Sequence, residues 1–124
     1  MVGKKLGNGI LFPTLFIPTV KENCFSDGTN KGYLYALEER ISERIDLDVD
    51  DSYTNKLYRS GMNKMAQKVG EEAVELVIEA KDDNADLFKE EAADLLYHML
   101  ILLKAKGFSL EDIEEVLYER ANSK

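Results

Sequence analysis

The sequence predicts an all-α domain, a bundle of four to five helices that a second copy of the chain completes. Apolar residues recur at helical spacing from residue 32 to the C-terminus, and residues typical of helix ends interrupt this pattern at intervals. Apolar residues also fall on more than one side of the two longest predicted helices. A second subunit is therefore expected to bury part of their surface.

Residues 1–31 differ from the rest of the chain. They contain both prolines and four of the eight glycines, and they show no helical period. Pro13 and Pro18 would restrict a strand here to the edge of a sheet. We therefore expect an irregular segment over residues 1–31 and an all-α domain over residues 32–124.

The predicted helix ends follow from local signals. Asp51 or Ser52 can cap a short helix that starts at residue 53 and ends at Gly61. Asn84 or Asp83 can cap the next-to-last helix, and Gly107 is a natural residue to end it. Helices are expected over residues 33–45, 53–60, 62–81 and 85–106, with a last one opened by Ser109 and Asp112 in a capping-box arrangement.

Composition excludes several classes of function. The chain has 124 residues and a formal net charge of −8, which disfavours general binding to nucleic acids or anionic membranes. No stretch approaches the roughly 20 apolar residues that span a bilayer. A single cysteine, Cys24, forms neither an internal disulfide nor a cysteine-cluster zinc site by itself. We expect a cytoplasmic protein.

Acidic residues line one side of the predicted helix over residues 62–81. At about 100° per residue, the acids share an arc of about a quarter-turn with two lysines, and apolar residues border this arc on both edges. Such a stripe is not expected to face bulk water alone. Its members are Lys64, Lys68, Glu71, Glu72, Glu75 and Glu79.

The following helix places acids on its apolar face. Glu91, Asp94 and His98 share this face with residues such as Leu95 and Leu102. Ionised carboxylates rarely occupy such positions unless they are paired or bind a cation, because desolvation of a charge costs several kcal/mol. Carboxylates from two neighbouring helices therefore point to a hard divalent cation, Mg²⁺ or Mn²⁺. His98 is more simply explained as a hydrogen-bonded core histidine.

The motif Glu71-Glu72-x-x-Glu75 followed by Glu91-x-x-Asp94 resembles the paired motif of the all-α nucleoside triphosphate pyrophosphatases, which include MazG-like and dimeric dUTPase-type enzymes. Within this superfamily the strings KVGEEAVE and EAADLLYH are similar to those of phosphoribosyl-ATP pyrophosphatases of histidine biosynthesis. The resemblance covers residues 33–120. It implies a MazG-like fold and a homodimer or higher homo-oligomer.

The resemblance also implies an activity and its residues. The reaction would be Mg²⁺-dependent hydrolysis of phosphoribosyl-ATP to phosphoribosyl-AMP and pyrophosphate, the second step of histidine biosynthesis. The implied metal ligands are Glu72, Glu75, Glu91 and Asp94, and the implied catalytic acids are Glu71, which would orient the attacking water, and Glu72. The implied substrate contacts are Lys64, Lys68 and Tyr53.

The N-terminal part resembles the junction of fused enzymes in which phosphoribosyl-AMP cyclohydrolase precedes the pyrophosphatase. The similarity rests on Asn23-Cys24-Phe25 and on residues 32–41. The other cyclohydrolase cysteines are absent, so Cys24 is interpreted as a remnant or a coincidence and cyclohydrolase activity is not expected.

Two alternatives remain open from the sequence. One is a house-cleaning nucleoside triphosphate pyrophosphatase that acts on a non-canonical nucleotide. The other is a non-catalytic helical oligomerisation module, in which the acids form ion pairs or hold a structural metal. Lys64 and Lys68 could then serve only as ion-pair partners for the acids.

Overall fold

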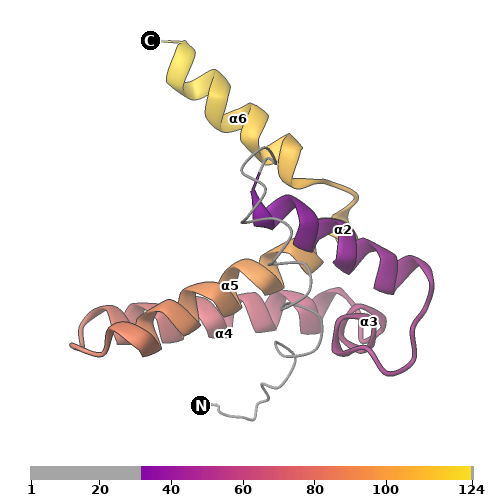
Figure 1. The fold of residues 1–124 in the computed structure, drawn as a ribbon, viewed down its shortest axis with the longest axis horizontal. Helices are drawn as coiled ribbons and strands as arrows, with labels where there is room; N and C mark the ends of the chain where they lie inside the picture. The colour runs from indigo at the N-terminus through magenta and orange to yellow at the C-terminus, as the bar shows by residue number, and fades with distance from the viewer. Residues whose placement is uncertain (1–31, 124) are drawn as a thin grey trace. The chain divides into compact units, whose positions relative to one another are not determined.

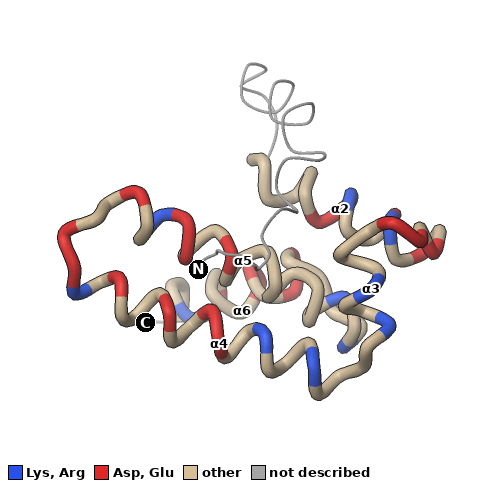
Figure 2. The backbone as a smooth tube through the Cα atoms, turned by 90° about the horizontal axis from the view of Figure 1, so that it is seen from below, with Lys and Arg blue, Asp and Glu red and all other residues tan. Residues whose placement is uncertain are grey.

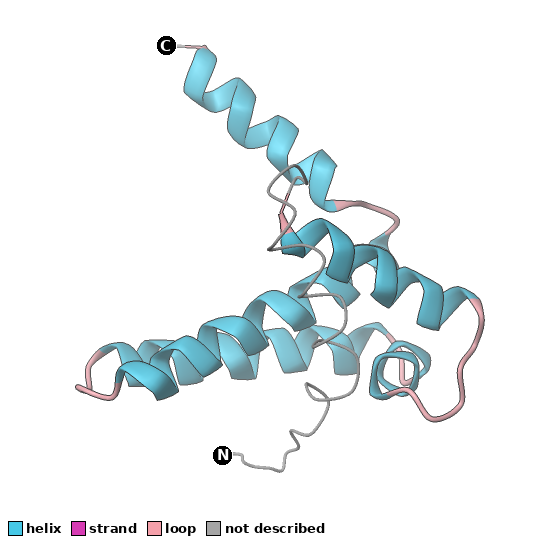
Figure 3. Ribbon diagram, in the orientation of Figure 1, coloured by secondary structure: helices cyan, strands magenta, loops and turns pink. Residues whose placement is uncertain are grey.

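The computed structural model describes residues 32–123, and over this range the chain consists of helices joined by turns and loops, with no strand (Figure 3). The predicted all-α class is confirmed. The expectations for residues 1–31, including those for Cys24, lie outside the described residues. The helices are α2 (Tyr33–Asp46), α3 (Tyr53–Arg59), α4 (Met62–Ala80), α5 (Ala85–Lys106) and α6 (Leu110–Asn122).

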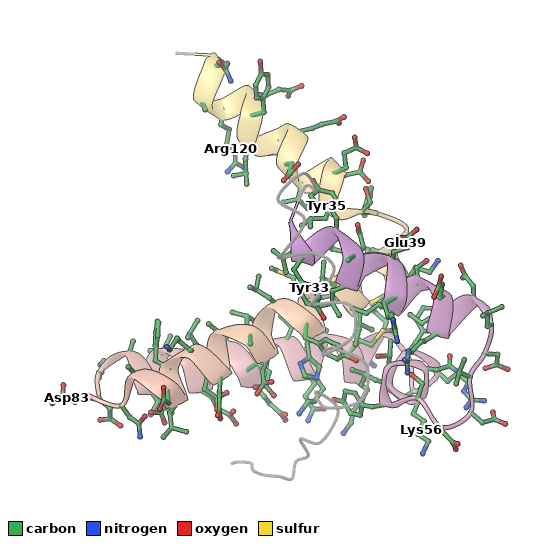
Figure 4. The ribbon with its side chains drawn as sticks, viewed as in Figure 1. Tyr33, Tyr35, Glu39, Lys56, Asp83 and Arg120 are labelled. Carbon is green, nitrogen blue, oxygen red and sulfur yellow. The ribbon has the colours of Figure 1, made fainter. Side chains whose placement is uncertain are left out.

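The chain from Ile41 onward forms one compact unit that is centred on α4 and α5. These helices follow one another through a short turn and lie side by side (Figure 1). The short helix α3 contacts both of them at one end of the pair. Asp83 marks the turn at the other end, well separated from Lys56 of α3 (Figure 4).

Local capping decides where the helices begin and end. Ser52 caps α3 and Asn84 caps α5, each by accepting a hydrogen bond from a backbone N–H in the first turn. Ser109 and Asp112 form the predicted capping box at the start of α6. Gly107 ends α5 with a φ of 86°, a left-handed conformation that glycine adopts without steric cost.

The core of this unit is small. Leu57 of α3, Met65 of α4 and Ile101 of α5 are buried, and Ile101 has no solvent exposure. Lys104 near the end of α5 forms an ion pair of 3.0 Å with Asp46. The packed region is thus the end of the α4–α5 pair that α3 covers.

Much apolar surface stays exposed on the single chain. Every residue of α6 except Leu110 is exposed. Val74, Val77 and Ile78 of α4 each keep more than half of their accessible surface. None of the described helices is long and apolar enough to cross a membrane.

Candidate metal centre and active site

Three of the four predicted metal ligands come together between α4 and α5. Glu72, Glu91 and Asp94 each offer a carboxylate oxygen, and these three oxygens lie within 4.8 Å of one another. Glu72 and Glu91 are buried and Asp94 is half-buried. Three acids this close repel one another, and burial increases the cost of their charge.

Two oxygens of the cluster have no hydrogen-bond partner. Both Glu72 Oε1 and Glu91 Oε1 are buried among protein atoms without a donor in reach. Buried carboxylate oxygens nearly always accept hydrogen bonds or coordinate a cation. The donor set therefore fits a hard divalent cation, because it consists only of carboxylate oxygens.

The pKa values of the acids reflect their crowding. Burial raises the pKa of Glu91, and so do the adjacent Glu75 carboxyl group and the negative charge of Glu75; the resulting pKa is about 8. Burial and the charges of Glu72 and Glu75 raise the pKa of Asp94 to about 7. Burial followed by the charge of Glu75 also raises the pKa of Glu72. A cation at the cluster would lower all three values.

Glu75 lies at the edge of this cluster. Its side chain is exposed, and it is not among the acids whose oxygens gather within 4.8 Å. Its influence on the pKa values of Glu72, Glu91 and Asp94 nonetheless places it next to them. Its role as a ligand stays a prediction.

Lys68, one of the two lysines predicted to contact the substrate, forms ion pairs with two acids of its own helix, and its contact with a substrate stays a prediction. Its ammonium lies 3.5 Å from Glu71 Oε1 and 3.4 Å from Glu72 Oε2. Glu71 is exposed, and a hydrogen bond from Gln67 followed by the nearby Lys68 lowers its pKa, so it stays ionised. Lys64 is exposed one turn earlier, and its charge also favours the ionised form of Glu71.

The charges of α4 divide along its length (Figure 2). Lysines occupy its first half, near α3, and acids follow towards the turn. Carboxylates and cationic side chains thus meet near the middle of the helix, where Lys68 and Glu72 pair. This arrangement suits a ligand that carries negative groups and is bound together with a cation.

Tyr53 and His98 adjoin the cluster on the side of α3. The Tyr53 hydroxyl lies 2.8 Å from His98 Nε2, and His98 Nδ1 lies 2.7 Å from the Asp94 carbonyl oxygen. Burial, and then the charges of Tyr97, Glu72 and other acids, raises the pKa of Tyr53 well above its usual value. The sequence placed His98 on the apolar face of its helix. The hydrogen bond between His98 and Tyr53 was not predicted, because these residues are 45 positions apart and meet only in the folded structure.

Comparison with known proteins identifies the family. The family model described as phosphoribosyl-ATP pyrophosphohydrolase matches residues 34–121. The chain belongs to this family. The resemblance inferred from the Glu71–Glu75 and Glu91–Asp94 motifs is thereby confirmed.

Its relatives are of two lengths. A phosphoribosyl-ATP pyrophosphatase of Pyrobaculum arsenaticum is 51% identical over 87 residues, covering 70% of this chain and 93% of that protein. The histidine biosynthesis bifunctional protein HisIE of Bacteroides thetaiotaomicron is 48% identical over 91 residues, 73% of this chain but 45% of the relative. The Escherichia coli HisIE is 42% identical over 99 residues, 79% of this chain and 49% of the relative. The chain spans about half the length of these bifunctional relatives.

Proposed function

We propose that the chain hydrolyses the α–β phosphoanhydride of phosphoribosyl-ATP, yielding phosphoribosyl-AMP and pyrophosphate in histidine biosynthesis. The observation that carries the proposal is the cluster of Glu72, Glu91 and Asp94 with two unpartnered buried oxygens, in a chain of this family. A cytoplasmic location is part of the same proposal.

The acid cluster is proposed to hold Mg²⁺, with Mn²⁺ as a chemically similar substitute. Glu72, Glu91 and Asp94 would provide ligands, and Glu75 would complete the set from the edge. A bound Mg²⁺ neutralises charge on phosphate oxygens and lowers the pKa of nearby water.

The remaining roles follow from charge and position. Glu71 keeps its charge because Gln67 and Lys68 lower its pKa, so it can accept a hydrogen bond from the attacking water and orient it. The ammonium groups of Lys68 and Lys64 can hold phosphate oxygens. Tyr53 lies beside the acids and is proposed to contact the substrate. The reaction consumes one water and needs no covalent intermediate.

The chain is further proposed to act as a homodimer or higher homo-oligomer. The carrying observation is the exposure of large apolar side chains on three helices, among them Val77 of α4, Met99 of α5 and Leu117 of α6. Monomers rarely expose so much apolar surface. Sedimentation equilibrium of the full chain should give a mass of at least twice the 14.1 kDa of one subunit. A monomer at micromolar concentration would contradict this part of the proposal.

The decisive experiment is an assay with phosphoribosyl-ATP and identification of the products. The full chain should release pyrophosphate in the presence of Mg²⁺ and none in EDTA. Release of orthophosphate would contradict the proposal. A panel of non-canonical nucleoside triphosphates in the same assay distinguishes a house-cleaning enzyme, and no turnover of any nucleotide would favour the oligomerisation module.

A further inference from the structure

Lys68 of α4 lies against the acid cluster. Its ammonium is 3.4 Å from Glu72 Oε2 and 3.5 Å from Glu71 Oε1, so it bridges a buried acid and an exposed one. The side chain of Lys68 keeps 23% of its accessible surface. The ammonium therefore reaches water as well as the acids, and it can turn away from them without disturbing the core.

The ammonium offsets only part of the negative charge of the cluster. It contacts one oxygen of Glu72, while the other oxygen of that carboxylate, Oε1, is buried without a hydrogen-bond partner. Glu91 Oε1 is buried in the same way, and Asp94 completes the group of oxygens within 4.8 Å of one another. One ammonium beside three acids leaves negative charge that a divalent cation would neutralise.

A cation and the Lys68 ammonium compete for Glu72. Mg²⁺ binds carboxylate oxygens at about 2.0–2.1 Å, so a cation held by Glu72 would share this carboxylate with the ammonium. Two positive groups at one carboxylate repel each other, and an ammonium paired with Glu72 weakens the attraction of this acid for a cation. Without another anion present, Lys68 lowers the affinity of the site for a cation.

An anion bound together with the cation removes this conflict. Phosphate oxygens are charged acceptors, and they offer the displaced ammonium a partner in place of Glu72. The four-carbon stem of Lys68 is flexible, and its three N–H donors rotate freely, so the ammonium can follow a new partner. The same side chain thus opposes a cation alone and favours a cation that carries phosphate.

We propose that Lys68 couples the binding of the cation to the binding of the polyphosphate: its ammonium pairs with Glu72 in the free protein and transfers to phosphate oxygens when both ligands are present. The consequence is a site that prefers a metal-bound polyphosphate to the metal ion alone. This inference rests on the proposed cation site but not on phosphoribosyl-ATP as the substrate.

The first measurement is the affinity of the full chain for Mg²⁺ alone, by calorimetry. Lys68→Met keeps an apolar stem and removes the charge, and it should bind Mg²⁺ about fivefold more tightly, since partly exposed ion pairs have modest effects. Lys68→Arg keeps the charge and should stay near the parent protein. Lys81→Met is the matched control, because it removes the same charge at the exposed end of α4. It should change the affinity by less than about twofold.

The second measurement is the affinity for inorganic pyrophosphate at saturating Mg²⁺. Lys68→Met should bind pyrophosphate about tenfold more weakly, because a charged hydrogen bond to phosphate is lost, and Lys68→Arg should retain most of the affinity. One substitution thus shifts the two affinities in opposite directions. A purely structural role of Lys68, such as holding Glu72 in place, predicts that both affinities fall. Thermal unfolding in EDTA checks that each variant is folded.

Mg²⁺ binding that is weaker or unchanged in Lys68→Met, or pyrophosphate binding that is unchanged, would overturn the proposal. These outcomes are separable from the proposed activity. If the two affinities shift in opposite directions but phosphoribosyl-ATP is not cleaved, only the proposed function fails. If phosphoribosyl-ATP is cleaved while Lys68→Met weakens Mg²⁺ binding, only the role of Lys68 fails.

Discussion

Two groups of polar side chains lie beside each other where α3, α4 and α5 meet. They differ in whether their buried polar atoms have hydrogen-bond partners. In the first group donors meet acceptors: the Thr54 and Tyr97 hydroxyls are hydrogen-bonded, and Tyr53 pairs with His98. In the second group, acids meet acids: Glu72 and Glu91 bury oxygens that no donor satisfies.

The difference separates stability from function. A satisfied buried network contributes to the free energy of folding and holds side chains in defined positions. A cluster of like charges lowers that free energy, as the raised pKa values of Glu91 and Asp94 show. Such a cluster is compatible with a stable fold when a bound ligand, such as a cation, offsets the repulsion between the carboxylates. Variants in the two groups should therefore have opposite consequences.

The largest effect is expected from Glu91→Gln. Removing this carboxylate should lower pyrophosphate release by about 100-fold or more, because a cation would lose a ligand at its centre. Above pH 8 in EDTA, where Glu91 is ionised, the free energy of unfolding should stay unchanged or rise, because a buried charge among like charges is gone. Steady-state kinetics and urea denaturation measure the two quantities.

Glu90→Gln is the matched control, since it makes the same change at the preceding, exposed position. Its activity should stay within about twofold of the parent protein. If Glu91→Gln kept full activity, or if it unfolded the protein while Glu90→Gln did not, the cluster would have to be regarded as structural.

An intermediate effect is expected from pH and Mg²⁺. The folded-state pKa values of Glu91, about 8, and Asp94, about 7, lie above their ordinary values of 4.5 and 3.8. The folded protein therefore binds more protons than the unfolded chain between these limits, and in EDTA its stability should fall as the pH rises from about 5 to 8. Thermal unfolding across this range measures the decline.

Saturating Mg²⁺ should oppose this decline, because ionised acids bind a cation and protonated ones do not. At a free Mg²⁺ concentration 100 times Kd, the added stability is about 2.7 kcal/mol. Glu91→Gln should show a shallower decline in EDTA and a smaller response to Mg²⁺. A melting temperature in EDTA that rose between pH 5 and 8 would contradict the assigned direction of the pKa shifts.

The smallest effect is expected in the satisfied network. Thr54→Val removes the hydroxyl that pairs with Tyr97 while nearly preserving shape, and should lower the free energy of unfolding by about 1–2 kcal/mol with turnover unchanged. Urea denaturation measures the loss. Thr54→Val combined with Tyr97→Phe should cost less than the two single changes together, because both partners of one bond are removed. Fully additive costs would show that the pair does not interact.

Local signals in the sequence were sufficient for most of the fold. The caps Ser52, Asn84 and Ser109 and the terminating Gly107 were all predicted, in two cases as one of two neighbouring candidates. Such signals act within one helical turn and depend little on distant residues. The pairing of acids on two helices was likewise visible, because their spacing places them on defined faces.

Position on a helical face did not predict burial within the acidic stripe. Glu72 and Glu75 lie three residues apart on α4 and about 60° apart around its axis, and Glu72 is buried whereas Glu75 is exposed. Both belong to the predicted acidic arc of about a quarter-turn, and α5 packs against α4. Periodicity gives the direction of each side chain around the helix axis, but not where the surface covered by a neighbouring helix ends.

By itself the sequence determined the helices, their ends, and the two faces that carry the acids, because these follow from the 3.6-residue repeat and from short-range hydrogen bonds. Only the tertiary structure decided which acids share one buried site and that His98 joins Tyr53 to Asp94. Those relations depend on contacts between residues about 20 to 45 positions apart, and such contacts exist only once the helices have packed.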